Sequence, residues 1–122
     1  MLIAYWIVAG LLALAMLAAG TMKTVRSKEA LKEAGMGWTE DWSTPLVKAI
    51  AIAEVVGAVG LVVPMLTGIA PVLSPIAAIC LAIIMVGAVV VHVRRAEPPY
   101  PPAVLGLLAI AAAVLGFLVI QG

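Results

Sequence analysis

Long apolar runs recur four times along this chain, separated by short polar segments. The first covers residues 2–22, 21 uncharged positions in a row. As a helix it measures about 31 Å, close to the thickness of the hydrocarbon core of a bilayer. The other runs cover residues 46–65, 75–92 and 103–120. The pattern predicts an all-α transmembrane four-helix bundle that forms one domain over residues 1–122.

The polar segment after the first run carries signals of its own. Ser27 is a suitable N-cap and Gly35 a suitable stop, so a short amphipathic helix is expected over residues 28–34. Trp38 and Trp42 follow it, and tryptophan prefers the headgroup zone of a membrane. This helix should therefore lie on the membrane surface.

Aromatic and serine residues also mark the other side of the predicted membrane. Tyr5 and Trp6 are expected to anchor the first run in the opposite headgroup zone. Ser74, followed directly by a proline, is expected to cap the third run.

Composition excludes several classes of protein. Hydrophobic residues make up 66% of the chain and charged residues 11%, which leaves too little polar surface for a soluble domain. The lipid bilayer is therefore the first expected partner, and a net charge of +1 argues against nucleic acid. Cys80 is the only cysteine and His92 the only histidine, so neither a disulfide, a thiol pair nor a zinc site is expected. No metal and no intrinsic cofactor is predicted.

The cations predict how the chain is oriented. Cytoplasmic loops of membrane proteins collect Lys and Arg. All seven such residues lie in or beside the first and third loops, and neither the second loop nor the termini carry one. We expect a multi-pass protein of the plasma membrane, with loops one and three cytoplasmic and both termini outside.

Small residues predict where helices pack. Helices in lipid associate through close contact of small side chains rather than through hydrophobic burial. Ala49, Ala53 and Gly57 recur at every fourth position of the second run, and Gly60 lies close by. Together with Gly20 in the first run, they predict the packing face.

Glu54 is the one charge placed deep inside a predicted helix. It lies eight residues into the second run, where a carboxylate costs roughly 2.5–3.5 kcal/mol to insert. Such a residue either marks a functional site, here as a candidate acid or base, or bonds a neighbouring helix as a neutral packing element. Lys48 lies on another face of the same helix and is expected to extend to the interface.

Several residues at the same depth are candidate partners of Glu54. Lys23 ends the first run, and His92 and Arg94 end the third. His92 is a candidate proton shuttle, although a histidine at a helix end more often stabilises the helix dipole. Thr21 is a further candidate for lining a pocket beside Glu54.

Two short motifs resemble the DoxX-like family of small four-helix membrane proteins. They are Gly20-Thr-Met-Lys23, and Glu54-Val-Val-Gly57-Ala-Val-Gly60-Leu in the second run. The resemblance implies that these two glycine-containing motifs, with Lys23 and Glu54, occupy the family's usual positions. It also implies a role in redox or thiol metabolism, since relatives include the small membrane subunit of a thiosulfate:quinone oxidoreductase.

Two classes of function are compatible with these residues, and whether the chain is catalytic stays open. The first is a non-catalytic membrane subunit that assembles a quinone- or thiol-linked redox partner, with Lys23 and Glu54 as an internal polar lock. The second is a small membrane enzyme or binding protein for a quinone or isoprenoid, with Glu54 as proton donor or acceptor. An ion channel would require a homo-oligomer to complete its polar path.

Overall fold

The computed structural model describes residues 1–122, with the side chains of Glu40 and Asp41 excepted. Four long helices account for most of the chain, and each is long and apolar enough to cross a membrane. They are α1 (Leu2–Val25), α3 (Thr44–Thr67), α4 (Leu73–Arg94) and α5 (Tyr100–Gln121). A short helix, α2 (Lys28–Glu33), and a 3₁₀ turn, η1 (Gly37–Asp41), connect α1 to α3. The predicted all-α bundle and its short connecting helix are confirmed.

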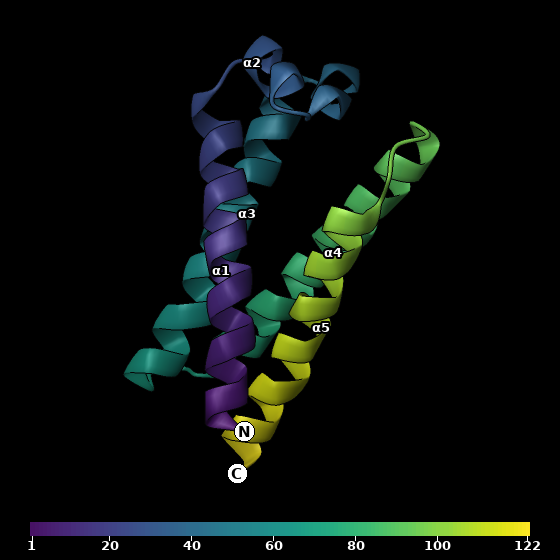
Figure 1. The fold of residues 1–122 in the computed structure, drawn as a ribbon. Helices are drawn as coiled ribbons and strands as arrows, with labels where there is room; N and C mark the ends of the chain where they lie inside the picture. The colour runs from purple at the N-terminus through teal and green to yellow at the C-terminus, as the bar shows by residue number, and fades with distance from the viewer.

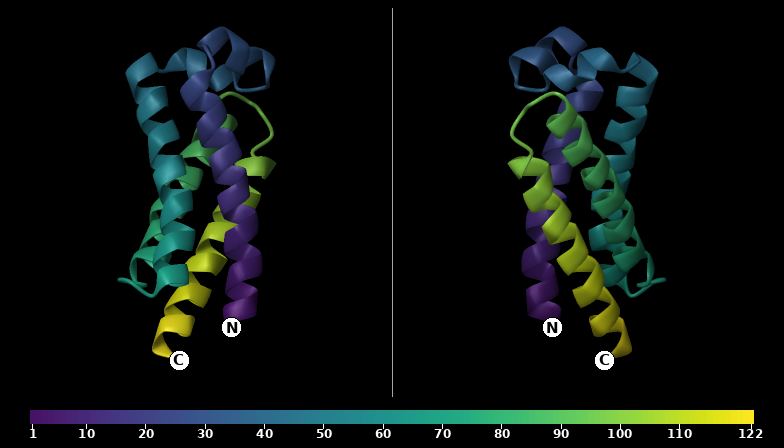
Figure 2. Two further views of the ribbon diagram at one scale, coloured as in Figure 1. Left: turned by 90° about the vertical axis from the view of Figure 1, so that its left-hand side faces the viewer. Right: turned by 90° about the vertical axis from the view of Figure 1, so that its right-hand side faces the viewer.

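The four long helices form a ring in which each helix runs antiparallel to both of its neighbours. α1 packs on α3 and α5, and α4 packs on the same two helices. Both termini lie at one end, while α2, η1 and the α4–α5 connection lie at the other (Figures 1 and 2). Toward that second end the α1–α3 pair and the α4–α5 pair diverge (Figure 1). The burial of α4 fits this divergence, because its last buried residue is Met85, although the helix continues to Arg94.

The helices extend two or three residues beyond most of the predicted runs, into the segments that flank them. At the start of α3, Ser43 Oγ accepts a hydrogen bond from Leu46 N at 3.3 Å. At the start of α2, Ser27 Oγ accepts one from Ala30 N at 3.2 Å, as the sequence predicts.

Ser74 is not the cap of α4, which begins at Leu73 without any side-chain cap. Its hydroxyl is buried and instead accepts a hydrogen bond at 3.1 Å from the backbone N–H of Met65. Met65 directly follows Pro64, the proline inside α3. Ser74 therefore joins α4 to α3 rather than closing its own helix.

The expected packing stripe on α3 is wrong at two of its positions. Ala49 and Ala53 are exposed on the outer surface of the bundle. A fourfold spacing advances 400° per step, so the stripe drifts by about 40° each time around the helix. Of the three residues at this spacing, only Gly57 therefore reaches the buried face, which consists of Val47, Ala51, Glu54, Gly57, Ala58 and Leu61.

Three glycines allow the helices to approach closely. A Cβ atom at Gly20 would lie 2.8 Å from the carbonyl oxygen of Ala51, so α1 lies against the backbone of α3 there. On the other side of α3, a Cβ at Gly57 would lie 2.7 Å from the Leu81 side chain, and one at Gly60 2.9 Å from Ala77 Cβ. These contacts are the close packing that helices in lipid require.

Tyr5 does not anchor the bundle in the headgroup zone. It is fully buried, and its hydroxyl donates a 2.6 Å hydrogen bond to the carbonyl oxygen of Leu61 and also interacts with the Ser74 hydroxyl. Trp6 packs edge-on against it, with ring centroids 5.4 Å apart. Tyr5 and Ser74 thus join α1, α3 and α4 near the end that carries the termini.

Lys48 closes the C-terminal end of α1. Its ammonium donates to the carbonyl oxygens of Lys23, Thr24 and Arg26, the last two at 2.9 Å. These are orphan carbonyls of a helix end, where a positive charge is also favoured by the helix dipole. The side chain of Lys48 therefore binds the neighbouring helix at the interface.

Candidate functional site

The centre of the candidate site is an ion pair between two spanning helices. Lys23, in the last turn of α1, donates through Nζ to Glu54 Oε1 on α3. The Lys23 side chain is 7% exposed and that of Glu54 1%. Gly20 lies one turn before Lys23, and its close contact with α3 brings the two helices near enough for the pair to form.

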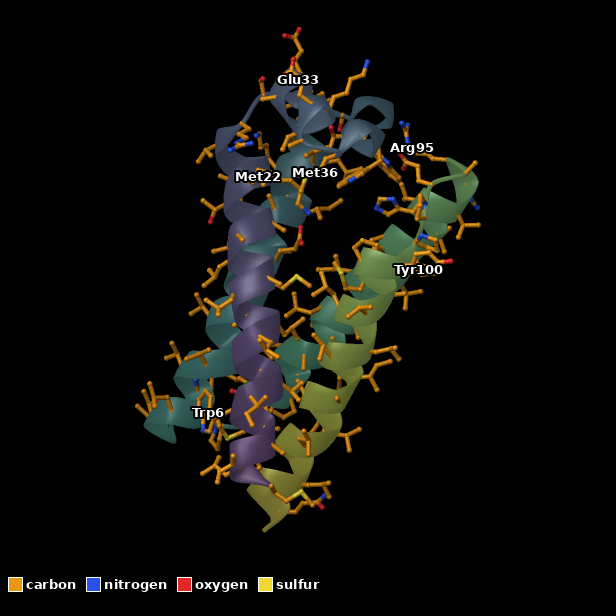
Figure 3. All side chains as sticks on the ribbon, in the orientation of Figure 1. Trp6, Met22, Glu33, Met36, Arg95 and Tyr100 are labelled. Carbon is orange, nitrogen blue, oxygen red and sulfur yellow. The ribbon has the colours of Figure 1, made fainter. Side chains whose placement is uncertain are left out.

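The polar segment after α2 covers this pair from the loop side. The Lys23 ammonium lies 5.4 Å from the centroid of the Trp38 ring, a cation–π contact. Trp38 belongs to η1, and the neighbouring Thr39 is fully buried and donates a 2.9 Å hydrogen bond to the carbonyl oxygen of Met36. η1 is therefore a cover over the ion pair as well as a connection. Figure 3 labels Met36, which directly precedes η1, at the height of Met22 near the end of α1.

This geometry determines which chemistry is open to Glu54. A carboxylate that accepts from an ammonium inside the bundle is neutralised and oriented by it. To exchange a proton with a ligand, Glu54 would first have to give up Lys23 or share it. The pair as it stands joins α1 to α3.

The end of α4 forms a separate polar cluster. His92 Nδ1 lies 3.3 Å from Glu97 Oε1, and Arg95 Nε donates to the same oxygen at 3.2 Å. Nδ1 of His92 is buried, and within the described part of the chain it makes no hydrogen bond of good geometry. His92 thus faces Glu97, the carboxylate of its own loop. Figure 3 shows Arg95 in this cluster.

Two other candidates lie on the outside of the molecule. Thr21 and Arg94 are both exposed. Among the sequence candidates, the structure thus brings Lys23 and Glu54 together and leaves Thr21, His92 and Arg94 apart from them. Trp38 is predicted from the sequence only as a membrane-surface residue, yet it contacts Lys23 of the ion pair. Its place just before the second run, close to Lys23 in depth, could have indicated this contact.

Two grooves stand out on the surface of the described residues, and Glu54 lines neither. One, of about 350 Å³, is wholly apolar and is formed by α4 and α5. The other, of about 420 Å³, lies where α1 ends and α3 begins, and it carries charged side chains. The apolar groove is lined by Ile79, Ala82, Ile83, Val86, Ile110, Ala113 and Val114.

Metal ligands do not gather in the part of the chain that the structure describes. No group of three or more His, Cys, Asp or Glu residues there is placed to hold a metal ion. Cys80 is a free thiol on the exposed face of α4.

Comparison with known proteins gives a family and no closer relative. The model of the DoxX-like family matches residues 7–114, which span α1 to the greater part of α5. No curated protein and no solved structure matches the chain.

Proposed function

Because the chain belongs to the DoxX-like family, we propose that it is a non-catalytic membrane subunit that assembles a partner of quinone- or thiol-linked redox metabolism. One observation carries this proposal: the only carboxylate in the middle of a spanning helix is already paired with Lys23, covered by η1 and buried. A lock of this kind holds a scaffold in one shape.

Redox chemistry in this proposal belongs to the partner. The chain has a single cysteine, so it lacks the thiol pair that thiol–disulfide exchange within one chain would use. The family resemblance supplies the class of partner, since relatives include a membrane subunit of a thiosulfate:quinone oxidoreductase. The bundle would hold such a partner at the membrane.

We place the protein in the plasma membrane, with the end that carries α2 and η1 in the cytoplasm. All seven Lys and Arg residues of the chain lie in or beside the two connections at this end. The positive-inside rule supports this orientation. A cytoplasmic partner would then meet α2, η1 and the α4–α5 connection.

The second candidate function is binding of a quinone or isoprenoid, with Glu54 as proton donor or acceptor. The observation in its favour is the apolar groove between α4 and α5, whose shape and lining suit a hydrocarbon tail. Its weakness is that Glu54 lines no part of this groove.

A capture experiment tests the subunit proposal. The chain is tagged at its natural expression level, extracted in a gentle detergent and purified, beside an unrelated tagged four-helix membrane protein as control. We expect a stoichiometric partner with quinone-reducing or thiol-oxidising activity, absent from the control. Recovery of the bundle alone would contradict the proposal.

Two variants separate the lock from the proton donor. Replacing both charges, Lys23→Met with Glu54→Leu, removes titration but leaves no unpaired charge. If the pair is a lock, this double variant captures the partner as the natural chain does. If Glu54 transfers protons, the double variant and Glu54→Gln both lose the redox activity of the complex even when they still bind the partner. A quinone that copurifies with the natural chain would then identify the ligand.

A further inference from the structure

A charged groove of about 420 Å³ lies where α1 ends, α2 begins and α3 enters the membrane. It is separate from the Lys23–Glu54 pair, neither member of which lines it. The groove is lined by Arg26, Ser27, Lys28, Glu29, Leu31, Thr44, Val47 and Lys48.

The groove carries an excess of positive charge. Three cations and one acid line it, which gives it a formal net charge of +2. Lys28 and Lys48 donate to backbone carbonyl oxygens, which do not cancel their charge. Arg26 is exposed, and its guanidinium makes no hydrogen bond or ion pair with the described residues. A planar guanidinium with free donors beside two fixed ammonium charges suits an anion with several oxygens.

Hydroxyl groups add donors on both sides of the groove. Ser27 Oγ accepts from Ala30 N, which leaves its own proton for a ligand. Thr44 is exposed in the first turn of α3, a 24-residue helix whose N-terminal end favours negative charge. The groove thus offers neutral donors next to its cations.

The apolar surroundings indicate which anion fits. Leu31 and Val47 form part of the lining and are buried. Beside the groove, Val25 is 74% exposed at the end of α1 and Leu46 40% exposed at the start of α3. The cations therefore lie at headgroup depth and the apolar side chains lie beside them. An anionic group attached to a hydrocarbon chain matches both the cations of the groove and the apolar side chains beside it.

We propose that this groove binds the phosphodiester headgroup of an anionic phospholipid, with Arg26 as its main contact. The proposal does not depend on the partner or the activity of the Lys23–Glu54 site. It makes the first loop a specific lipid contact rather than a diffuse positive surface.

Two arginines provide a matched test. The purified protein is titrated with phosphatidylglycerol or phosphatidylcholine in detergent, and binding of single lipids is measured by native mass spectrometry. We expect Arg26→Gln to weaken phosphatidylglycerol binding about fivefold, the usual effect of one basic side chain at an anionic surface. Arg94→Gln, which removes an arginine that is also exposed but lies outside the groove, is expected to leave it unchanged.

Further variants and ligands cover the remaining outcomes. Arg26→Lys should keep most of the affinity. If Arg26→Gln does not fold, Thr44→Val takes its place in the test and should also weaken phosphatidylglycerol binding. Equal loss in Arg26→Gln and Arg94→Gln would overturn the proposal, because any surface charge would then suffice. Equal binding of phosphatidylcholine would also overturn it. So would displacement of the lipid by excess inorganic phosphate, which would identify a free-phosphate site.

Discussion

At the scale of single residues, Glu54 shows what a charge in a spanning helix requires. Sequence alone identified the residue, because a carboxylate in an apolar run stands out against its neighbours. Its partner was one of several at similar depth, and only the packing of α1 on α3 selects Lys23. Depth limits the candidates, and the face of each helix decides among them.

Removing one charge of this pair should destabilise the bundle strongly. In Glu54→Gln, the Lys23 ammonium stays buried without its counter-ion, which costs about 3–5 kcal/mol in comparable buried pairs. The double variant Lys23→Met with Glu54→Leu should regain that stability or exceed the natural chain. Thermal unfolding in detergent measures both.

A control on the same side of the molecule makes this comparison specific. Glu33→Gln removes an exposed carboxylate at the end of α2, which points away from the bundle in Figure 3, and should change stability little. A Glu54→Gln variant as stable as Glu33→Gln would show that the pair contributes nothing. A double variant less stable than Glu54→Gln would show that the stability is lost through packing rather than through an unpaired charge.

At the scale of helices, hydropathy predicts where a span lies but not which way it faces. Lipid and protein interior are equally apolar, so a spanning helix need not show the one-sided pattern of a soluble helix. Tyr5 and Ser74 illustrate this: both were assigned to the membrane boundary, yet both are buried and bonded between helices. Polar groups inside lipid indicate the buried face better than apolar ones do.

Two glycines of α1 should respond to the same substitution with opposite signs. At Gly20 an added Cβ meets the Ala51 carbonyl oxygen at 2.8 Å, and a backbone atom yields only if the helices separate. Gly20→Ala should therefore cost about 1–3 kcal/mol of stability. At Gly10 nothing lies within 4 Å, so Gly10→Ala should stabilise the helix by about 0.5–1 kcal/mol.

Unfolding midpoints of these two variants, measured side by side, test the packing of α1 on α3. Both substitutions add one methyl group to one helix, which makes each the control for the other. A stability gain in Gly20→Ala would show that α1 and α3 do not approach as closely as described.

At the scale of the whole molecule, the number of spans, their order and the short helix of the first loop follow from the sequence. Each rests on a one-dimensional signal: a long apolar run, a proline, or a serine whose hydroxyl oxygen accepts from the backbone N–H three residues later. The ring of helices, the cover that η1 forms over Lys23, and the place of His92 beside Glu97 depend on helix rotation. Neither spacing nor hydropathy contains that information.

Orientation is the prediction that belongs to the entire chain. With both termini at one end and the cations at the other, a reporter that is active only outside the cytoplasm, such as alkaline phosphatase, should be active when fused after Gly122 (Figure 1). The same enzyme inserted after Gly35, between α2 and η1, should be inactive. The reverse pair of activities would place α2 and η1 outside the cell.

The ion pair between Lys23 and Glu54 also bears on how the protein is made. α1 is synthesised before α3, so Lys23 is already at the membrane interface when Glu54 enters the bilayer. Entering alone, Glu54 would meet hydrocarbon at a cost of roughly 2.5–3.5 kcal/mol; entering beside α1, it meets a cation. The first two spans therefore form an antiparallel hairpin in which the buried charge of α3 is neutralised without any residue of α4 or α5.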